Sequence, residues 1–553
     1  MHCALAPWCL KDGVERYAQN KFQIKVVDMT VNENAEAAAQ KIISEQPDCI
    51  GFGCYIWNIC FIQQLLRIIK RELPDSKIVI GGPEVSENAA NAFKKLPEID
   101  FLIRGEGEIP FAKLMDALLT KQDTENIEGL CSREKPYAKP FSSDSFLGLS
   151  YRDEYFKQLN GRISYIETSR GCPFSCSFCL SGKGSKVKYL PMEQSKEAIL
   201  QLANSSSQTI KFVDRTFNAN IKRAKQIISF IIEKNREGAI PSGKCFHFEV
   251  AADLMDDETI DLFNKAPAGL FQIEAGIQSL NKQTLEAISR SASVERICNA
   301  LKKTIKSNTV HVHVDLIAGL PYENLESFIH GFNQVFKLHP HALQLGFLKV
   351  LHGSRIKTQA EEYGIHYSKK PPYQVTRTKW LSESDLNVLA QAERALELMY
   401  NRKRFVNTVI YITKNLCEPF ELFYNLGGVI LREEQNKGQP LSLDELTEAM
   451  YYFLTDKFPL NAQEIKNHML FDRLSFVATS YIPVCLRTYC SSLNEIKRKI
   501  GILHPIPPKI HRSFAIMQQG EELCILWADY MNRHPVTKSY IVNRMRVKEF
   551  LNY

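Results

Sequence analysis

Short apolar runs alternate with longer stretches of helical periodicity through the first 375 residues of this 553-residue chain. In residues 1–130 the helical stretches include AEAAAQKIISEQ (35–46) and IQQLLRIIKREL (62–73). The strand-like runs are FQIKVVDMTV (22–31), DCIGFGCY (48–55), KIVIGG (77–82) and IDFLIRGEGE (99–108). Strands and helices that alternate at this spacing predict a parallel sheet with helices on both faces, a doubly wound, flavodoxin-like α/β domain.

Glycines follow or close three successive strands of this predicted sheet. Without a Cβ atom, glycine lets the backbone approach a ligand closely, and doubly wound sheets bind ligands beyond the carboxyl ends of their strands. The alternative is that these are ordinary turn glycines. The predicted rim for a large ligand consists of Gly53, Gly81, Gly82 and Gly105, with Ser86 and Glu108 beside them.

A linker at residues 131–160 leads to a second region at 161–375, where six further strand-like runs are separated by helical stretches. This pattern predicts a βα barrel or a partial barrel, whose catalytic face lies at the carboxyl ends of the strands. The six runs are ISYIETSRG, TIKFVDRTFN, CFHFEVAAD, LFQIEAGIQS, VHVHVDLIAGLP and ALQLGFLKVLHG.

The third region, residues 376–553, has a different pattern, which predicts a mostly helical domain. Ser382 and Ser442 each precede a run of apolar residues with helical spacing, and both suit the N-cap of a helix. Residues 482–553 hold 11 Lys or Arg against 5 Asp or Glu. Because these charges are interleaved with apolar residues, as in IVNRMRVKEFL, a solvated helix face is favoured over a nucleic-acid site.

The composition is that of an ordinary globular protein, with 44% apolar and 24% charged residues. We find no apolar run of the roughly 18 residues that would cross a bilayer, and no secretory leader pattern at the N-terminus. The fifteen cysteines are scattered, unlike the dense framework of a secreted disulfide protein. These features predict a cytoplasmic protein.

One group of cysteines departs from that scatter. The sequence SRGCPFSCSFCLS places Cys172, Cys176 and Cys179 on one loop directly after the first strand of the predicted barrel. Three thiolates at this spacing can bind three irons of a [4Fe-4S] cluster and leave the fourth iron open. A structural zinc site would need a fourth ligand, and no other Cys or His follows in the sequence before Cys245.

This cysteine motif at the start of a βα barrel resembles that of the radical S-adenosylmethionine (SAM) superfamily. The resemblance implies that the open iron binds SAM and that the reduced cluster cleaves SAM to a 5'-deoxyadenosyl radical. It also implies an electron donor such as flavodoxin or ferredoxin. The residues that the resemblance assigns to SAM are Phe178 near the adenine, Asp214 at the amino group, Glu274 and Gln278 at the ribose, and Gly319 near the adenine.

The N-terminal region together with the barrel resembles the cobalamin-binding class of radical SAM proteins. The motifs GFGCYIWN, GGPEVS, RGEGE, FVDRTFN and DLIAGLPYE further resemble a subgroup with a C-terminal domain of unknown function. In this class the glycine-rich rim would hold cobalamin. The Asp-x-His motif that supplies a lower cobalt ligand in other cobalamin proteins is absent, and the chain starts where relatives have an earlier strand.

The function implied by this resemblance is cobalamin-dependent methyl transfer to an unactivated carbon. One alternative keeps cobalamin but carries out a radical cyclisation, rearrangement or oxidation without methylation. Another alternative is a cobalamin or redox sensor that binds nucleic acid through its basic C-terminus.

Overall fold

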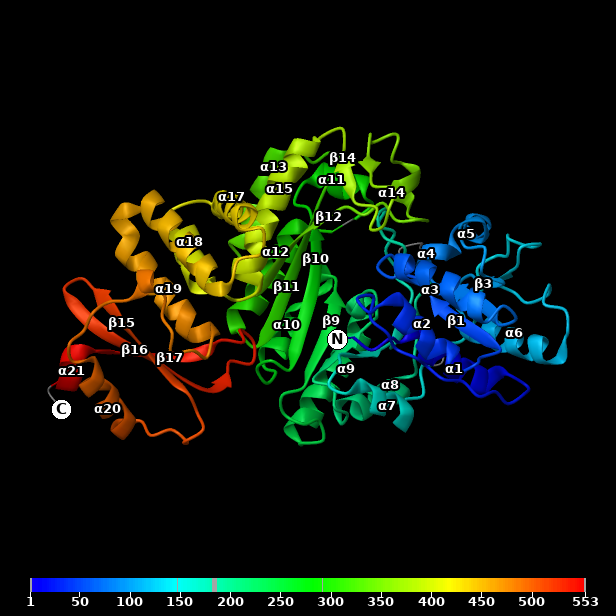
Figure 1. Ribbon diagram of the computed structural model, residues 1–553, viewed down its shortest axis with the longest axis horizontal. Coiled ribbons are helices and arrows are strands. Elements are labelled where there is room, and N and C mark those ends of the chain that lie inside the picture. The colour runs from blue at the N-terminus through cyan, green and yellow to red at the C-terminus, as the bar shows by residue number, and fades with distance from the viewer. Residues whose placement is uncertain (1, 147, 182–185, 291, 552–553) are drawn as a thin grey trace. The chain divides into compact units, whose positions relative to one another are not determined.

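The structure is a computed structural model that describes residues 2–146, 148–181, 186–290 and 292–551 (Figure 1). The chain forms two compact units. The first contains Met1–Leu254, Leu285–Ser291 and Phe347–Lys379, and the second contains Met255–Thr284, Ala292–Gly346 and Trp380–Tyr553. No helix in the described ranges is both long enough and apolar enough to cross a membrane.

The first unit begins with a sheet in the order β1-β2-β3-β4. Strands β1 (Cys49–Gly53), β2 (Lys77–Gly81) and β3 (Phe101–Ile103) are parallel, and β4 (Leu130–Cys131) pairs with β3 in the antiparallel sense.

Helices cover both faces of this sheet, as the blue part of Figure 1 shows. Ile78 and Ile80 of β2 pack in one core with α2 (Ala35–Ile43), α3 (Ile59–Glu72) and α5 (Ala89–Lys95). Val79 lies between them in sequence and packs in another core with α1 (Ala6–Tyr17) and α6 (Glu108–Thr120). Successive side chains of a strand point to opposite faces, so three consecutive residues of β2 are apolar and buried, and the doubly wound fold is confirmed.

The strand predicted at residues 22–31 is wrong, because these residues do not pair with a strand in the structure. Their backbone is held by side chains instead: Lys11 Nζ donates to the Ile24 carbonyl at 3.0 Å, and Gln158 Nε2 donates to the Val26 carbonyl at 3.2 Å. The FQIKVVDMTV pattern has a strand's apolar content, but a strand also requires a neighbour that takes its backbone hydrogen bonds.

Gly82 adopts a backbone conformation that other residues rarely reach, with φ of 106°, and an added Cβ would lie 2.5 Å from the Cys54 carbonyl oxygen. We expect Gly82→Ala to lower the free energy of unfolding by about 3 kcal/mol, from backbone strain plus the clash. Denaturant unfolding measures this change. Gly161→Ala is the control, because Gly161 also has positive φ but nothing within 4 Å of an added Cβ; equal losses at the two positions would contradict the role of the Cys54 contact.

The six strand-like runs predicted for the barrel all form strands. The first unit holds β5 (Ser164–Ile166), β8 (Thr209–Phe212) and β9 (Cys245–Val250), which are parallel in the order β5-β8-β9. Helices α8 (Met192–Ala203) and α9 (Ile221–Arg236) follow in the βα pattern. The short pair β6 (Ser169–Arg170) and β7 (Lys188–Tyr189) flanks the segment that contains the cysteines.

The second unit holds β10 (Phe271–Gln278), β11 (Val310–Ala318) and β12 (Ala342–Phe347), with β11 in the middle. Buried and half-buried residues alternate strictly along β10 and β11. One face of this strand pair is therefore apolar, and the other carries Glu274, His313 and Asp315. The helices of this part are α10 (Asp257–Asn264), α12 (Val294–Ser307) and α13 (Leu325–Phe336).

The C-terminal region is mostly helical, as predicted. Ser382 and Ser442 each form a capping box at the start of α15 (Glu383–Ala395) and α18 (Leu443–Lys457). A π-helical turn, η3 (Leu396–Asn401), continues α15. The other long helices are α16 (Val406–Asn415), α17 (Pro419–Lys437), α19 (Ala462–Phe476) and α20 (Leu493–Leu503).

The helical interpretation of IVNRMRVKEFL (541–551) is wrong for its first six residues. Strands β15 (Arg512–Gln519), β16 (Glu522–Arg533) and β17 (Tyr540–Arg546) form an antiparallel sheet, red in Figure 1, and of this run only Val547–Leu551 is helical. IVNRMR therefore lies on a strand. Charged and apolar residues that alternate in a short run fit an edge strand as well as a helix face, and the pairing with β16 selects the strand.

Candidate cluster and cofactor site

Cys172, Cys176 and Cys179 lie on the loop after β6. The fifteen cysteines all lie in the described ranges and none of them forms a disulfide there; Cys172 and Cys176 are buried, whereas Cys179 is half-buried. Burial raises the pKa of Cys176, Arg290 lowers it, and the neighbouring charges of Cys179 and Cys172 raise it further. The three sulfur atoms therefore lie close enough to interact electrostatically, and this all-thiolate donor set fits an iron–sulfur cluster.

Two polar groups lie against the cysteine sulfurs. Thr216 Oγ1 is 3.5 Å from Cys172 Sγ, and Arg290 Nη1 donates to Cys176 Sγ over 3.7 Å. Donors next to ligating sulfurs stabilise negative charge on a cluster, and this charge increases when the cluster is reduced. Sequence reasoning missed both residues, since neither lies within the motif.

Segments distant in sequence hold the backbone of the cysteine loop. The Ser177 N–H donates to the Ile288 carbonyl at 2.9 Å, and the Ile356 N–H donates to the Ser177 carbonyl at 2.8 Å. Arg355 Nη2 donates to the Ser175 carbonyl at 3.0 Å. Phe178, predicted near the adenine, is half-buried on this anchored loop.

Asp214 follows β8 and is only 2% exposed. Its carboxylate accepts hydrogen bonds from Thr168 N–H at 2.8 Å, Thr168 Oγ1 at 2.6 Å and Ser169 Oγ at 2.7 Å. Burial raises its pKa, and these hydrogen bonds oppose that shift. Both oxygens thus bind the segment just before the cysteine loop, a role that differs from the contact with the SAM amino group predicted from the sequence.

Arg170, two residues before Cys172, lies among carboxylates. It donates to Glu167 at 2.7 Å and to Glu108 at 2.8 Å, and forms an ion pair with Glu106 at 3.4 Å. Burial opposes its charge, but Glu167 and Glu108 raise its pKa above the usual value. These four residues line one pocket of the first unit. Glu108, predicted at the cobalamin rim, therefore connects the end of β3 to the cysteine loop.

The predicted cobalamin rim divides into two parts. The loops after β1 and β2 adjoin, because Cys54 N–H donates to the Gly81 carbonyl at 2.7 Å. An added Cβ at Gly53 would meet only the Tyr55 ring, at 3.3 Å, so ligand access there is limited by a side chain and not by backbone. On this glycine-lined edge Gly53 leaves the backbone open to a large flat cofactor, whereas the Cβ position of Gly82 lies against the Cys54 carbonyl oxygen.

The other rim residues have partners within the protein. Gly105 has φ of 87°, and a Cβ there would lie 2.1 Å from the Phe141 carbonyl oxygen, so this glycine is required by contact with the chain itself. The Ser86 hydroxyl donates to the Gly82 carbonyl at 2.7 Å.

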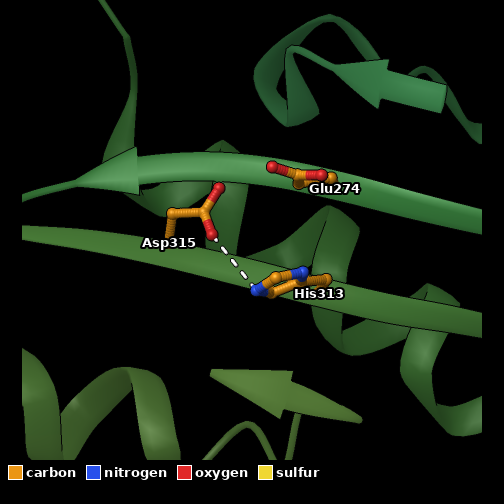
Figure 2. A group of neighbouring side chains, drawn as sticks. All are labelled: Glu274, His313 and Asp315. Atoms are coloured by element: carbon orange, nitrogen blue, oxygen red, sulfur yellow. Dashed lines mark ion pairs between the residues drawn. The ribbon is translucent and has the colours of Figure 1, made fainter. Parts of the chain in front are cut away.

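In the second unit, Glu274 of β10 lies next to His313 and Asp315 of β11 (Figure 2). One ligand atom from each lies within 4.8 Å of the others, and His313 Nε2 is 3.3 Å from Asp315 Oδ1. The parallel register pairs Glu274 with His313. The HVHVD alternation, which puts His313 and Asp315 on one strand face, is the signal that could have revealed His313.

The other predicted SAM contacts of the second unit lie at strand ends. Gln278 ends β10 with φ of 72°, and Gly319 follows β11 with φ of 92°. The loops after these two strands are joined by Ser279 Oγ, which donates to Glu323 Oε1 at 2.5 Å. Burial, opposed in part by the hydrogen bond with Ser279, raises the pKa of Glu323 to about 7. Glu323 was not among the predicted site residues.

Three family models match successive parts of the chain. Residues 11–115 match the B12 binding domain, 166–334 the Radical SAM superfamily, and 361–510 a protein family of unknown function, DUF4080. The chain therefore combines a B12 binding domain, a Radical SAM domain and a C-terminal DUF4080 domain.

Curated relatives share about a quarter of their residues with the chain. The cobalamin-dependent radical SAM methyltransferase TokK of Streptomyces tokunonensis is 26% identical over 59% of this chain and 51% of its own. The anaerobic magnesium-protoporphyrin IX monomethyl ester cyclase of Rubrivivax gelatinosus is 24% identical over 54% of this chain and 56% of its own. The chain thus spans about half the length of these relatives.

Solved structures with the same fold are more distant in sequence. The radical SAM methyltransferase TsrM of Kitasatospora setae superposes with a TM-score of 0.58 at 15% identity, over 83% of this chain and 97% of its own. The cobalamin-dependent SAM radical enzyme OxsB gives a TM-score of 0.58 at 14% identity, over 86% of this chain and 81% of its own. These likenesses support the fold.

Proposed function

We propose that the protein is a cobalamin-dependent radical SAM enzyme that transfers a methyl group to an unactivated carbon. The observation that carries this proposal is the anchored loop with three free thiols in a chain that also has a B12 binding domain. When bound, a [4Fe-4S] cluster would supply the electron that cleaves SAM to an adenosyl radical, and cobalamin would supply the methyl group. We place the protein in the cytoplasm, where a flavodoxin or ferredoxin would deliver that electron.

The chain's own residues have distinct proposed roles. Cys172, Cys176 and Cys179 hold the cluster, and Asp214 orders the loop before them. Phe178 contacts SAM, and the SAM contacts predicted from the sequence at Glu274, Gln278 and Gly319 stay predictions. Cobalamin lies against Gly53, Gly81 and Gly82, beside the turn of Ser86, while Gly105 and Glu108 shape the third loop of that edge.

Methylation is tested by anaerobic incubation of the reconstituted enzyme with SAM that carries a trideuterated methyl group and with fractionated cell extract. A product heavier than its precursor by one trideuterated methyl group supports the proposal. The match to the cyclases gives a second reaction to test. A product formed without the deuterium label would show radical cyclisation or oxidation. Salt-dependent nucleic-acid binding without SAM cleavage would support the alternative of a cobalamin or redox sensor.

Cobalamin binding is tested at Gly53, which is half-buried at the end of β1. We expect Gly53→Trp to lose at least nine-tenths of the cobalamin absorbance of the reconstituted protein, because the indole would fill the space next to Tyr55. Gly501→Trp is the control, since nothing lies within 4 Å of a Cβ there. Full cobalamin absorbance in folded Gly53→Trp, as checked by circular dichroism, would place the cofactor elsewhere.

A further inference from the structure

Basic side chains gather near the N-terminal end of β11, eight residues from Gly319, or about 26 Å along an extended strand. His311 and His341 lie with ring centroids 5.3 Å apart. The pKa of His311 is lowered to about 2, first by burial and then by the charges of Lys403, His341, His313 and Lys538. The pKa of His341 is lowered to about 4, first by burial and then by the charges of Lys403 and His534. The basic cluster is His311, His341, Lys403, His534 and Lys538.

The two lysines of the basic cluster lie in turns of the backbone. Lys403 follows the π-helical turn η3 and has left-handed backbone, φ of 61°, with its N–H bonded to the Tyr400 carbonyl at 2.9 Å. Lys538 has φ of 60°, in the turn between β16 and β17. This turn packs against the second unit, because a Cβ added to Gly269, just before β10, would lie 2.6 Å from the Pro535 Cβ.

Backbone N–H groups donate to Nδ1 of two of the histidines. His341 Nδ1 accepts from Val312 N–H at 3.1 Å, and its Nε2 lies 3.2 Å from Asn308 Oδ1. His534 Nδ1 accepts from Val536 N–H at 3.3 Å and from Thr537 N–H at 3.2 Å. With Nδ1 as acceptor, each Nε2 carries the hydrogen, and His534 therefore presents an N–H donor.

Three other members of the basic cluster are Lys403, Lys538 and His311. Lys403 Nζ lies 5.5 Å from the centroid of the Tyr400 ring, and burial lowers the lysine pKa to about 8. Within the ranges that the structure describes, neither Lys403 nor Lys538 forms an ion pair, and His311 Nδ1 is buried without a hydrogen-bond partner. A partly buried cation without a counter-charge is costly unless something supplies one.

We propose that the basic cluster is a binding site for an oxyanion, specifically the phosphate group of a small molecule. Two ammonium groups and an imidazole N–H need several acceptor oxygens at once, and a tetrahedral phosphate offers more of them than a carboxylate does. The site is formed by β11, η3 and the turn between β16 and β17. It therefore uses the DUF4080 region and the tail sheet, and it stands independently of the radical chemistry.

The test is calorimetric titration of the full-length protein with inorganic phosphate at constant ionic strength, alongside thermal unfolding. We expect saturable binding and a rise in Tm that chloride does not produce. Glycerol phosphate and acetate are the comparison ligands: tighter binding of glycerol phosphate identifies a phosphoester, whereas equal binding of acetate and phosphate would overturn the phosphate assignment.

Lys403→Met and Lys538→Met are the test variants, and Lys302→Met, an exposed position on α12, is the control. Each test variant should weaken phosphate binding at least tenfold, while the control binds like the parent. Without phosphate, Lys403→Met should unfold at the same or a higher temperature, because an unpaired charge is removed. The proposal fails if the parent binds no phosphate, or if both test variants bind it as tightly as the parent.

Discussion

Cys172→Ala, Cys176→Ala and Cys179→Ala should each end SAM cleavage, measured as release of 5'-deoxyadenosine under a strong reductant without oxygen. A cluster held by two thiolates exposes two irons and is labile, so loss of any one ligand should remove the characteristic iron–sulfur absorbance as well. The expected effect is a loss of activity to background and not a partial decrease.

Cys245→Ala and Cys298→Ala are the matched controls. Both cysteines are half-buried, are not in a disulfide and lie outside the cysteine loop. Loss of one sulfur there should cost about 1 kcal/mol of stability or less and leave the cluster intact. Cleavage at the parent rate by a loop variant, or loss of iron from a control, would show that the cluster lies elsewhere.

Asp214→Ala should destabilise the protein even without any cofactor, by about 3 to 5 kcal/mol. The change leaves the Thr168 N–H and hydroxyl and the Ser169 hydroxyl without their acceptor in a buried site. Denaturant unfolding of the apoprotein measures the loss, and reconstitution should then incorporate less iron.

This experiment separates two roles for Asp214. A residue that only bound the SAM amino group would leave apoprotein stability and iron content unchanged. Asp257→Ala is the control, because Asp257 is largely exposed at the start of α10 and pairs with Lys303 at 2.6 Å. Its loss should change stability by less than about 1 kcal/mol. Equal effects of the two changes would contradict the anchoring role.

Local patterns predicted much of this fold. The apolar β2 strand and the capping boxes at Ser382 and Ser442 each follow from residues within a few positions of one another. Residues 22–31 and 540–546 were misjudged because strand formation depends on a partner, which lies outside the window that a pattern covers.

The cysteine motif likewise gave the candidate cluster ligands, but not their surroundings. Arg290 is 114 positions from Cys176, and Thr168 is 46 positions from Asp214. No spacing rule connects such pairs, since they meet only when strands and loops have packed. Glu323 was missed for the same reason: its partner Ser279 follows a different strand.

The backbone hydrogen bonds that anchor the cysteine loop also determine when during synthesis the cluster can be inserted. The backbone of Ser177 is hydrogen-bonded to Ile288 and Ile356. A nascent chain that emerges from the ribosome therefore contains the cysteine motif before it contains either of these two residues. Contacts of such sequence separation form late in folding. Iron delivered before residue 356 has emerged would meet an eight-residue cysteine motif whose backbone is not yet anchored, whereas iron delivered after that residue has folded would meet the anchored loop. Cluster insertion in this protein is therefore expected only after the first 356 of its 553 residues have been synthesised.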